Sequence, residues 1–455
     1  MERHVSPAMD FSRTAHVQAV QRRATPWDLV VIGGGATGAG IALDAASRGY
    51  AVALIERHDF GKGTSSRSTK LIHGGVRYLA EGDLALVREA LRERGLLLRN
   101  APHLVHELPF IIPCLKWWEP SYYGLGLWLY ERLAGRRGLS LTRRLSRAEL
   151  FAAVPTLQPD AWRGGVVYAD GQFDDARLLI DLIKTAAEHG AVVVNYCSAR
   201  GLIKDVAGRV VGVDACDEES GACFQLRARW VINATGVFCD AVRRMADASL
   251  LPLVAPSQGV HLVLPGRFLP GSHALMIPRT DDGRVLFAIP WHGHTLLGTT
   301  DTARPDAPPE PAASEAEIDF ILATAGRYLT PAPTRADVLS VFVGIRPLVR
   351  AARAKSTAKL SRDHTIQVDV PGLLTITGGK WTTYRNMAED ALNEAVRLAG
   401  LPKRQCVTAE LRLHGGGEVR RRTDHRWVYG SDAAAVEQLE QADPGLAARL
   451  HADLP

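Results

Sequence analysis

The sequence predicts an α/β fold that opens with a strand, a glycine loop, a helix and a second strand. A short apolar run, residues 28–32, precedes the glycine-rich residues 33–38, and an alanine-rich helical pattern follows. A second apolar run, residues 51–55, ends at Glu56. Buried strands that alternate with helices in this way form parallel sheets. The chain has 455 residues, 46% of them hydrophobic and 23% charged, so it is long enough for more than one globular domain.

Composition and charge exclude several classes of protein. The net charge of +5 is too small and too dispersed to indicate nucleic-acid binding. No apolar run approaches the roughly 18 residues of a membrane span, since the longest, residues 122–133, contains Glu131 and Arg132. The six cysteines have no ligand spacing, so we expect no disulfide framework, no metal or iron–sulfur site, and a reducing compartment. Residues 1–26 are polar and lack an apolar secretion segment, and we expect a flexible extension there.

The glycine loop matches the GxGxxG pattern of a Rossmann-type dinucleotide-binding unit at Gly33, Gly35 and Gly38. The first glycine permits a tight turn, the second lets a pyrophosphate approach the backbone, and the third allows the helix to pack closely. The helix N-terminus then faces the anion. Glu56 is placed to accept hydrogen bonds from a ribose, and its charge would repel a 2′-phosphate, which disfavours NADP.

The next segment favours FAD over NAD. Residues 64–70 contain five hydroxyl side chains in seven residues and lead into the sequence LIHGGVRYL. A plain NAD-binding domain would continue to its next strand and helix without such a segment. A row of hydroxyl and amide groups suits a longer ligand that reaches towards an isoalloxazine ring. The alternative is a solvated loop that caps a helix.

Later elements follow from local patterns. Residues 80–100 have leucines at helical spacing, and Asp174 or Asp175 is a candidate N-cap for the helix after it. Apolar runs predict strands at 191–195, 210–214, 229–233, 260–264, 285–289 and 296–298, and helices at 314–328 and 384–398. The strand 229–233 runs into the turn Ala234-Thr235-Gly236, where backbone can again approach a dinucleotide.

Taken in order, the motifs IGGGATGAG, TSSRSTKLIHGGVRYL, INATG, GIRPL, SRDHT and GGKWTTYR resemble the FAD-dependent glycerol-3-phosphate dehydrogenases, within the D-amino-acid-oxidase-like flavoproteins. The resemblance covers roughly residues 27–430. It implies a Rossmann-type FAD-binding domain interleaved with a mixed-sheet α+β substrate domain, and then a small helical segment. The expected ranges are 27–105, 170–250 and 345–398 for the FAD-binding domain, 106–169 and 251–344 for the substrate domain, and 399–455 for the C-terminal helical segment. That segment is shorter than in most family members, which leaves truncation open.

The resemblance also implies a reaction and a location. Oxidation of sn-glycerol 3-phosphate would yield dihydroxyacetone phosphate, and electrons would pass from reduced FAD to a membrane quinone. The protein would lie in the cytoplasm, on the inner face of the cytoplasmic membrane, in contact with the membrane surface. A homodimer is compatible with this reading, and neither nucleic acid nor metal is expected as a partner.

Such a substrate needs fixed positive charge for its phosphate and a proton acceptor for its hydroxyl. By resemblance, the substrate-binding residues are Arg77, Tyr78, Arg346, Arg362 and Lys380. Arg362 and Lys380 would hold the phosphate, and Arg346 would stabilise the C2 oxygen. His73 and His261 compete as the proton acceptor and complete the catalytic set with Arg346. The expected FAD-binding residues are Gly33, Gly35, Ala36, Thr37, Gly38, Glu56, Arg57, Thr64, Ser65, Ser66, Ser68, Lys70, Leu71, His73, Gly74, Gly75, Ala234, Thr235, Gly236, Gly379, Lys380, Thr382 and Thr383.

Residues 116–130 are rich in tryptophan and tyrosine, and four arginines follow at 136, 137, 143 and 144. Tryptophan flanked by arginine suits a lipid interface. A core helix of the substrate domain accounts for the same residues, and both interpretations remain open.

Other functions are weighed against the quinone-linked dehydrogenase. An oxidase would pass electrons to oxygen, although such relatives tend to have an insertion that this chain lacks. An amine oxidase is disfavoured by the four basic residues of the expected pocket, and an iron–sulfur-linked relative by the missing cysteine cluster. A non-catalytic flavin-binding protein is supported only by the short C-terminus, and it would bind FAD that glycerol 3-phosphate fails to reduce.

Overall fold

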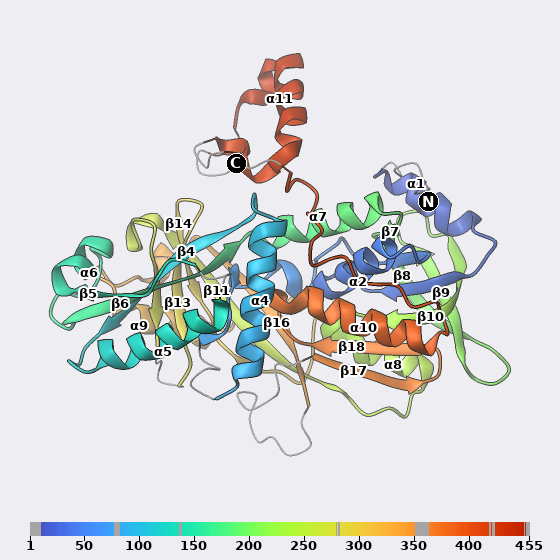
Figure 1. Cartoon of the computed structure of the whole chain (residues 1–455), viewed down its shortest axis with the longest axis horizontal. Helices are drawn as coiled ribbons and strands as arrows, with labels where there is room; N and C mark the ends of the chain where they lie inside the picture. The colour runs from blue at the N-terminus through green and yellow to red at the C-terminus, as the bar shows by residue number, and fades with distance from the viewer. Residues whose placement is uncertain are drawn as a thin grey trace.

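The structure is a computed structural model and describes residues 11–76, 82–135, 139–278, 280, 283–350, 364–417, 420, 424–449 and 451. Its strands form two large sheets that lie side by side, with the helix α4 (Leu84–Asn100) between them (Figure 1). One sheet is mostly parallel and the other mostly antiparallel. This arrangement confirms the predicted α/β fold with a mixed sheet, while the expected domain boundaries stay a prediction.

The first sheet is built around the strands of the glycine loop. Its order is β17 (His364–Val370), β18 (Leu373–Gly378), β10 (Cys223–Asn233), β1 (Trp27–Ile32), β2 (Val52–Ile55) and β7 (Val192–Val194), with β8 (Cys197–Lys204) and β9 (Val210–Asp217) paired beyond β10. Pairing is parallel from β18 through to β7 and antiparallel between β17 and β18.

Helices cover both faces of this sheet. The helices α2 (Ala36–Ser47), α7 (Asp175–Glu188) and α10 (Tyr384–Leu398) pack on one face, against Leu29 and Val31 of β1. The helices α1 (Arg13–Arg22) and α8 (Cys239–Ala246) pack with β8 and β9 on the other face, against Val30 and Ile32. Burial on both faces explains why β1 is a continuous apolar run instead of an alternating one.

The second sheet is mixed. Its order is β15 (Thr302–Ala303), β11 (Val254–Pro265), β14 (His294–Gly298), β13 (Leu286–Trp291), β12 (Ala274–Ile277), β4 (Val105–Cys114), β6 (Gly164–Phe173) and β3 (Leu71–Ile72), with β16 (Ser340–Val349) on β11 and β5 (Arg143–Ser146) on β6. The helices α6 (Arg147–Ala153) and α9 (Glu315–Gly326) cover one face, and α5 (Glu119–Ala134) covers the other. Only β12 and β4 pair in parallel among these strands of the described chain.

Several predicted elements are confirmed. The helix α10 has the predicted bounds, and α9 begins after Ser314 in a capping box with Glu317. The helix α7 starts at Asp175, with Asp174 as its N-cap. The helix predicted at 80–100 begins at Leu84, because the Asp83 side chain accepts a hydrogen bond from the Leu86 N–H. The C-terminal segment contains the helix α11 (Ala433–Ala442), after short 3-10 turns at His425–Asp432.

Two expectations differ from the structure. The expected flexible extension contains the helix α1, whose His16 and Val20 are buried against the first sheet, with the Val193 N–H donating to His16 Nδ1. Cys216 and Cys223, for which no disulfide was expected, form one. They lie directly opposite each other in the antiparallel pairing of β9 and β10, a proximity that sequence spacing does not reveal.

Candidate active site

The glycine loop joins β1 to α2 where a side chain could not fit. Gly33 has φ +111°, and a Cβ there would lie 2.7 Å from the Ala234 carbonyl oxygen. A Cβ on Gly38 would lie 1.9 Å from the Gly33 oxygen. The N-cap of α2 is Gly35, which has no side chain to cap the helix, so the N-terminus is suited to an anion. The loop therefore has the geometry for a pyrophosphate.

Glu56 lies at the end of β2, beside this loop. Its two carboxylate oxygens accept hydrogen bonds from the Gly34 N–H at 2.7 Å and from the His58 N–H at 2.8 Å. Each oxygen keeps a further lone pair, which fits a pair of ribose hydroxyls. The backbone hydrogen bonds also hold the carboxylate in place for that contact.

The hydroxyl-rich segment links neighbouring parts of the fold. The Ser65 hydroxyl accepts the Ala36 N–H at 3.0 Å, and the Thr64 hydroxyl donates to the Ile345 carbonyl at 2.6 Å. Ser66 donates to the Gly61 carbonyl. Ser68 and Lys70 both contact the buried Asp175 carboxylate, with Lys70 Nζ at 2.5 Å. Part of this segment therefore fixes the loop, and Lys70 contributes its charge to an ion pair with Asp175.

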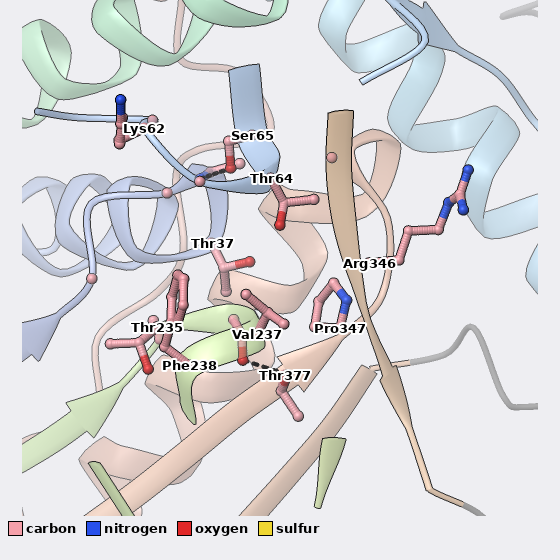
Figure 2. Close-up of a pocket in the computed structure, with 18 of the residues that line it drawn as sticks. Thr37, Lys62, Thr64, Ser65, Thr235, Val237, Phe238, Arg346, Pro347 and Thr377 are labelled. Carbon is pink, nitrogen blue, oxygen red and sulfur yellow. Dashed lines mark hydrogen bonds between the residues drawn. The ribbon is translucent and has the colours of Figure 1, made fainter. Parts of the chain in front are cut away.

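A cavity of about 490 Å³ lies between these elements, lined by residues of both sheets (Figure 2). Figure 2 shows Thr37, Thr64 and Ser65 on one side and Thr235, Val237, Phe238 and Thr377 on the other. Its lining includes Glu56, His73 and Lys380. The expected cofactor residues that line it are Gly33, Gly35, Ala36, Thr37, Glu56, Arg57, Thr64, Ser65, Ser68, Leu71, His73, Ala234, Thr235, Gly236, Gly379, Lys380 and Thr382. Gly38, Ser66, Lys70, Gly74, Gly75 and Thr383 are not in its lining.

A second cavity of about 200 Å³ shares part of this lining. Thr69, Leu71, His73, Phe287 and Arg346 border both cavities. In Figure 2 the Arg346 side chain points away from its neighbour Pro347, as alternate residues of a strand do. The two cavities therefore adjoin at the residues that they share.

Arginine gathers at this second cavity. Arg346 donates to the Thr300 carbonyl at 3.1 Å and to the Thr299 hydroxyl at 3.2 Å. The Asp301 carboxylate lies 3.7 Å from Arg346 and 3.9 Å from Arg284. Sequence reasoning missed Arg284, Thr299, Thr300 and Asp301 as cavity residues. The run Gly298-Thr299-Thr300-Asp301 after a predicted strand was the available signal.

His261 lies on β11 in the lining of the large cavity and is 2% exposed. Its Nε2 is 2.9 Å from the Thr69 hydroxyl, and its ring stacks on Phe342 with centroids 4.7 Å apart. Burial, with Arg346 and Lys70 adding positive charge, lowers the pKa of His261 well below its ordinary value. The imidazole is therefore neutral at pH 7, and the same burial and neighbouring cations disfavour its protonated form.

The other expected residues divide into two groups. His73 lines both cavities, and its carbonyl accepts a hydrogen bond from the Thr382 hydroxyl at 3.3 Å. Arg77, Tyr78 and Arg362 lie outside the described residues. Within the described ranges, no cluster of three or more histidine, cysteine or acidic side chains could hold a metal ion.

The helix α5 both packs and exposes aromatic side chains. Leu127 and Tyr130 of the helix are buried, whereas Tyr122, Leu125 and Trp128 of the helix are exposed, as are Trp117 and Trp118 just before it. Cations lie over the exposed tryptophans: Lys116 is 5.6 Å from the Trp118 ring and Arg132 is 5.2 Å from the Trp128 ring. The buried side chains agree with the interpretation as a packed helix, and the lipid interface stays a prediction. In the described part of the chain, no helix combines the length and apolarity needed to cross a membrane.

Comparison with known proteins places these features in context. The profile of the family described as "FAD dependent oxidoreductase" matches residues 28–385. The chain is 48% identical over 420 residues to a mitochondrial glycerol-3-phosphate dehydrogenase of Arabidopsis thaliana, covering 89% of this chain and 66% of that one. It is 45% identical over 419 residues to the mitochondrial glycerol-3-phosphate dehydrogenase of Rattus norvegicus, covering 89% and 57%.

A solved structure is also similar. The glycerol-3-phosphate dehydrogenase from Bacillus halodurans, in complex with FAD, has 33% identity and a TM-score of 0.72, and the match covers 89% of this chain and 70% of that one. The chain thus spans 66% and 57% of the length of the two curated relatives.

Proposed function

Because the chain belongs to the FAD-dependent oxidoreductase family, we propose that it oxidises sn-glycerol 3-phosphate to dihydroxyacetone phosphate, with FAD in the large cavity. One observation carries the proposal: a cavity shaped for a dinucleotide meets a smaller cavity lined by Arg346 and Arg284. A reducible ring at the end of the first would face an anionic substrate in the second. The relatives named as glycerol-3-phosphate dehydrogenases support this substrate.

The residues present fit FAD. The N-terminus of α2 and Gly35 would receive the pyrophosphate, and Glu56 would receive the adenosine ribose. Leu71, His73, Lys380 and Thr382 of the lining would surround the flavin ring. When bound, FAD supplies the acceptor for the hydride from C2 of the substrate.

Positive charge binds and orients the substrate. Arg346 and Arg284 line the smaller cavity, and Lys380 lies in the adjoining lining of the larger one. We assign Lys380 to the phosphate, together with Arg362 from the sequence motif. Arg346 is anchored by the Thr300 carbonyl and stabilises negative charge on the C2 oxygen.

A neutral histidine takes the hydroxyl proton. As the C2 hydride leaves, the O–H bond breaks and its electron pair forms the carbonyl of the product, so the proton needs an acceptor. His261 is neutral and lies at the cavity end with Arg346 nearby. His73, which borders both cavities, is the alternative acceptor.

Anaerobic reduction of the flavin tests this function. Addition of glycerol 3-phosphate to the FAD-loaded protein without oxygen should bleach the long-wavelength flavin absorbance, whereas glycerol should not. The R346K variant should be reduced at least roughly tenfold more slowly, because Lys cannot reproduce the bidentate geometry of Arg. An intact flavin band after addition of glycerol 3-phosphate would contradict the proposal and favour a non-catalytic flavin-binding protein.

We further propose a quinone as the electron acceptor and attachment to the inner face of the cytoplasmic membrane, with the protein as a homodimer. The exposed aromatic face of α5, with Lys116 and Arg132 over its tryptophans, supports contact with an anionic lipid surface.

Reoxidation of the reduced flavin tests the electron acceptor. We expect a soluble quinone to reoxidise the reduced protein faster than dissolved oxygen does. Faster reoxidation by oxygen would instead identify an oxidase.

Vesicle sedimentation tests the lipid contact. The triple substitution W117S, L125S and W128S should reduce binding to vesicles with anionic lipid at least fivefold, because it removes two exposed apolar side chains of α5 and the exposed Trp117 just before it. The matched control L251S, L439S and L446S removes exposed leucines elsewhere and should bind as the wild type does. Equal binding by both variants would exclude α5 as the contact.

A further inference from the structure

Tyr130 is a buried residue of α5 that belongs to none of the expected sites. It is 2% exposed, and its hydroxyl makes two hydrogen bonds. The hydroxyl donates to Asp170 Oδ2 at 2.8 Å and accepts the Gly74 N–H at 2.7 Å. One donor and one acceptor are thus both used, in a region from which water is excluded. Burial, with the Asp170 carboxylate, raises the pKa of Tyr130 well above its ordinary value, so the hydroxyl stays protonated.

Asp170 is itself held in place. Its Oδ1 accepts a hydrogen bond from Arg94 Nη1 of α4 at 2.8 Å, and both side chains are 2% exposed. The Arg94 guanidinium lies 5.7 Å from the centre of the Tyr130 ring. Asp170 also lines the smaller cavity. The contacts therefore run from Arg94 through Asp170 to Tyr130, and Asp170 places them at the edge of the smaller cavity.

From Tyr130 the contacts continue to the loop that carries His73. A Cβ on Gly74 would lie 2.5 Å from the Tyr130 hydroxyl oxygen, so only glycine allows this approach. On the opposite side, the Thr382 hydroxyl donates to the His73 carbonyl at 3.3 Å. The loop is thus fixed from α5 on one side and from the turn before α10 on the other. His73 borders both cavities at this point.

From this geometry we propose that Tyr130 is a positioning residue, which fixes residues 73–75 against the flavin and so sets the geometry of hydride transfer. The proposal deepens the proposed function and rests on it. Tyr130 does not touch either cavity in the described lining. It acts through the backbone of Gly74, and the interaction depends on a single oxygen atom.

The Y130F variant removes that oxygen and leaves the Gly74 N–H buried without an acceptor. We expect the rate of flavin reduction by glycerol 3-phosphate to fall roughly 10- to 100-fold, because small displacements of reacting groups have effects of this size. The substrate concentration for half-maximal rate should change less than about threefold, since the cationic side chains that bind the phosphate are untouched. The absorption spectrum of the resting, FAD-loaded protein should also shift.

Tyr50 provides a matched control. It is 4% exposed, and its hydroxyl donates to the Pro402 carbonyl at 2.6 Å, outside both cavities. Y50F likewise removes a tyrosine hydroxyl that makes a hydrogen bond, and it should leave the resting flavin spectrum and the reduction rate as in the wild type. Equal rates and equal spectra in Y130F and Y50F would overturn the proposal.

The resting flavin spectra and amide hydrogen exchange test the role of Tyr130 even if the proposed function is wrong or a variant does not fold. If glycerol 3-phosphate does not reduce the wild-type flavin, the proposed function fails, yet the resting spectra still decide the role of Tyr130. Amide hydrogen exchange on the wild-type protein needs no variant to fold. The Gly74 amide should exchange slowly in the wild type, and exchange at the rate of an exposed loop would contradict the anchor.

Discussion

The ion pair between Lys70 and Asp175 offers the sharpest test of how the hydroxyl-rich loop is held. Asp175 is fully buried at the start of α7, and its carboxylate accepts hydrogen bonds from Lys70 Nζ at 2.5 Å, the Ser68 N–H at 3.0 Å and the Ser68 hydroxyl at 2.6 Å. D175N keeps one oxygen but removes the charge opposite Lys70. Breaking one partner of a buried pair destabilises by about 3–5 kcal/mol. Since Asn can retain a Ser68 hydrogen bond, we expect about 3 kcal/mol.

Urea unfolding and FAD titration measure this effect together. D175N should lower the free energy of unfolding and weaken FAD binding, because the loosened loop carries Ser65, whose hydroxyl supports the Ala36 N–H. D174N is the control, since Asn is as good an N-cap as Asp. A difference below about 1 kcal/mol between the two variants would refute the reasoning.

Three further predictions concern other parts of the structure. E56Q should raise the FAD dissociation constant about tenfold or more in a fluorescence titration, because a charge-assisted hydrogen bond to the ribose is weakened; an unchanged constant would place the ribose elsewhere. The pKa of His261 is lower in the folded than in the unfolded chain. Below pH 6.5 the imidazole therefore binds a proton in the unfolded chain while it is still neutral in the folded one. The wild type should therefore lose up to about 1.4 kcal/mol of stability per pH unit relative to H261N as pH falls below 6.5, and parallel pH profiles would contradict this. Reduction of the Cys216–Cys223 disulfide should lower the free energy of unfolding by about 2 kcal/mol, a change that urea unfolding with and without reductant would detect.

The sequence by itself determined the local elements and the dinucleotide loop. Gly33 and Gly38 could be recognised because each has a conformational or packing requirement that only glycine meets, and the strand before them and the helix after them are contiguous in the chain. The caps Asp174 and Ser314 and the bounds of α10 follow from the same local chemistry. FAD was favoured for a similar reason, since the hydroxyl-rich segment begins at Thr64, close after Glu56 in the chain.

Only the tertiary structure decided which distant residues share the second cavity. Arg284, Asp301 and Arg346 come together because β14 pairs with β13 and β11, and β11 pairs with β16. This pairing depends on long-range packing that no local pattern encodes. The contact between Tyr130 and Gly74 arises in the same way, because α5 packs against the loop that carries His73. The structure also showed that Thr64, Ser65 and Ser68 both line the cavity and hold its loop, whereas Ser66 only holds the loop. Sequence patterns report the propensity of each segment, whereas a site depends on the distances between segments, which the packing of the two sheets sets.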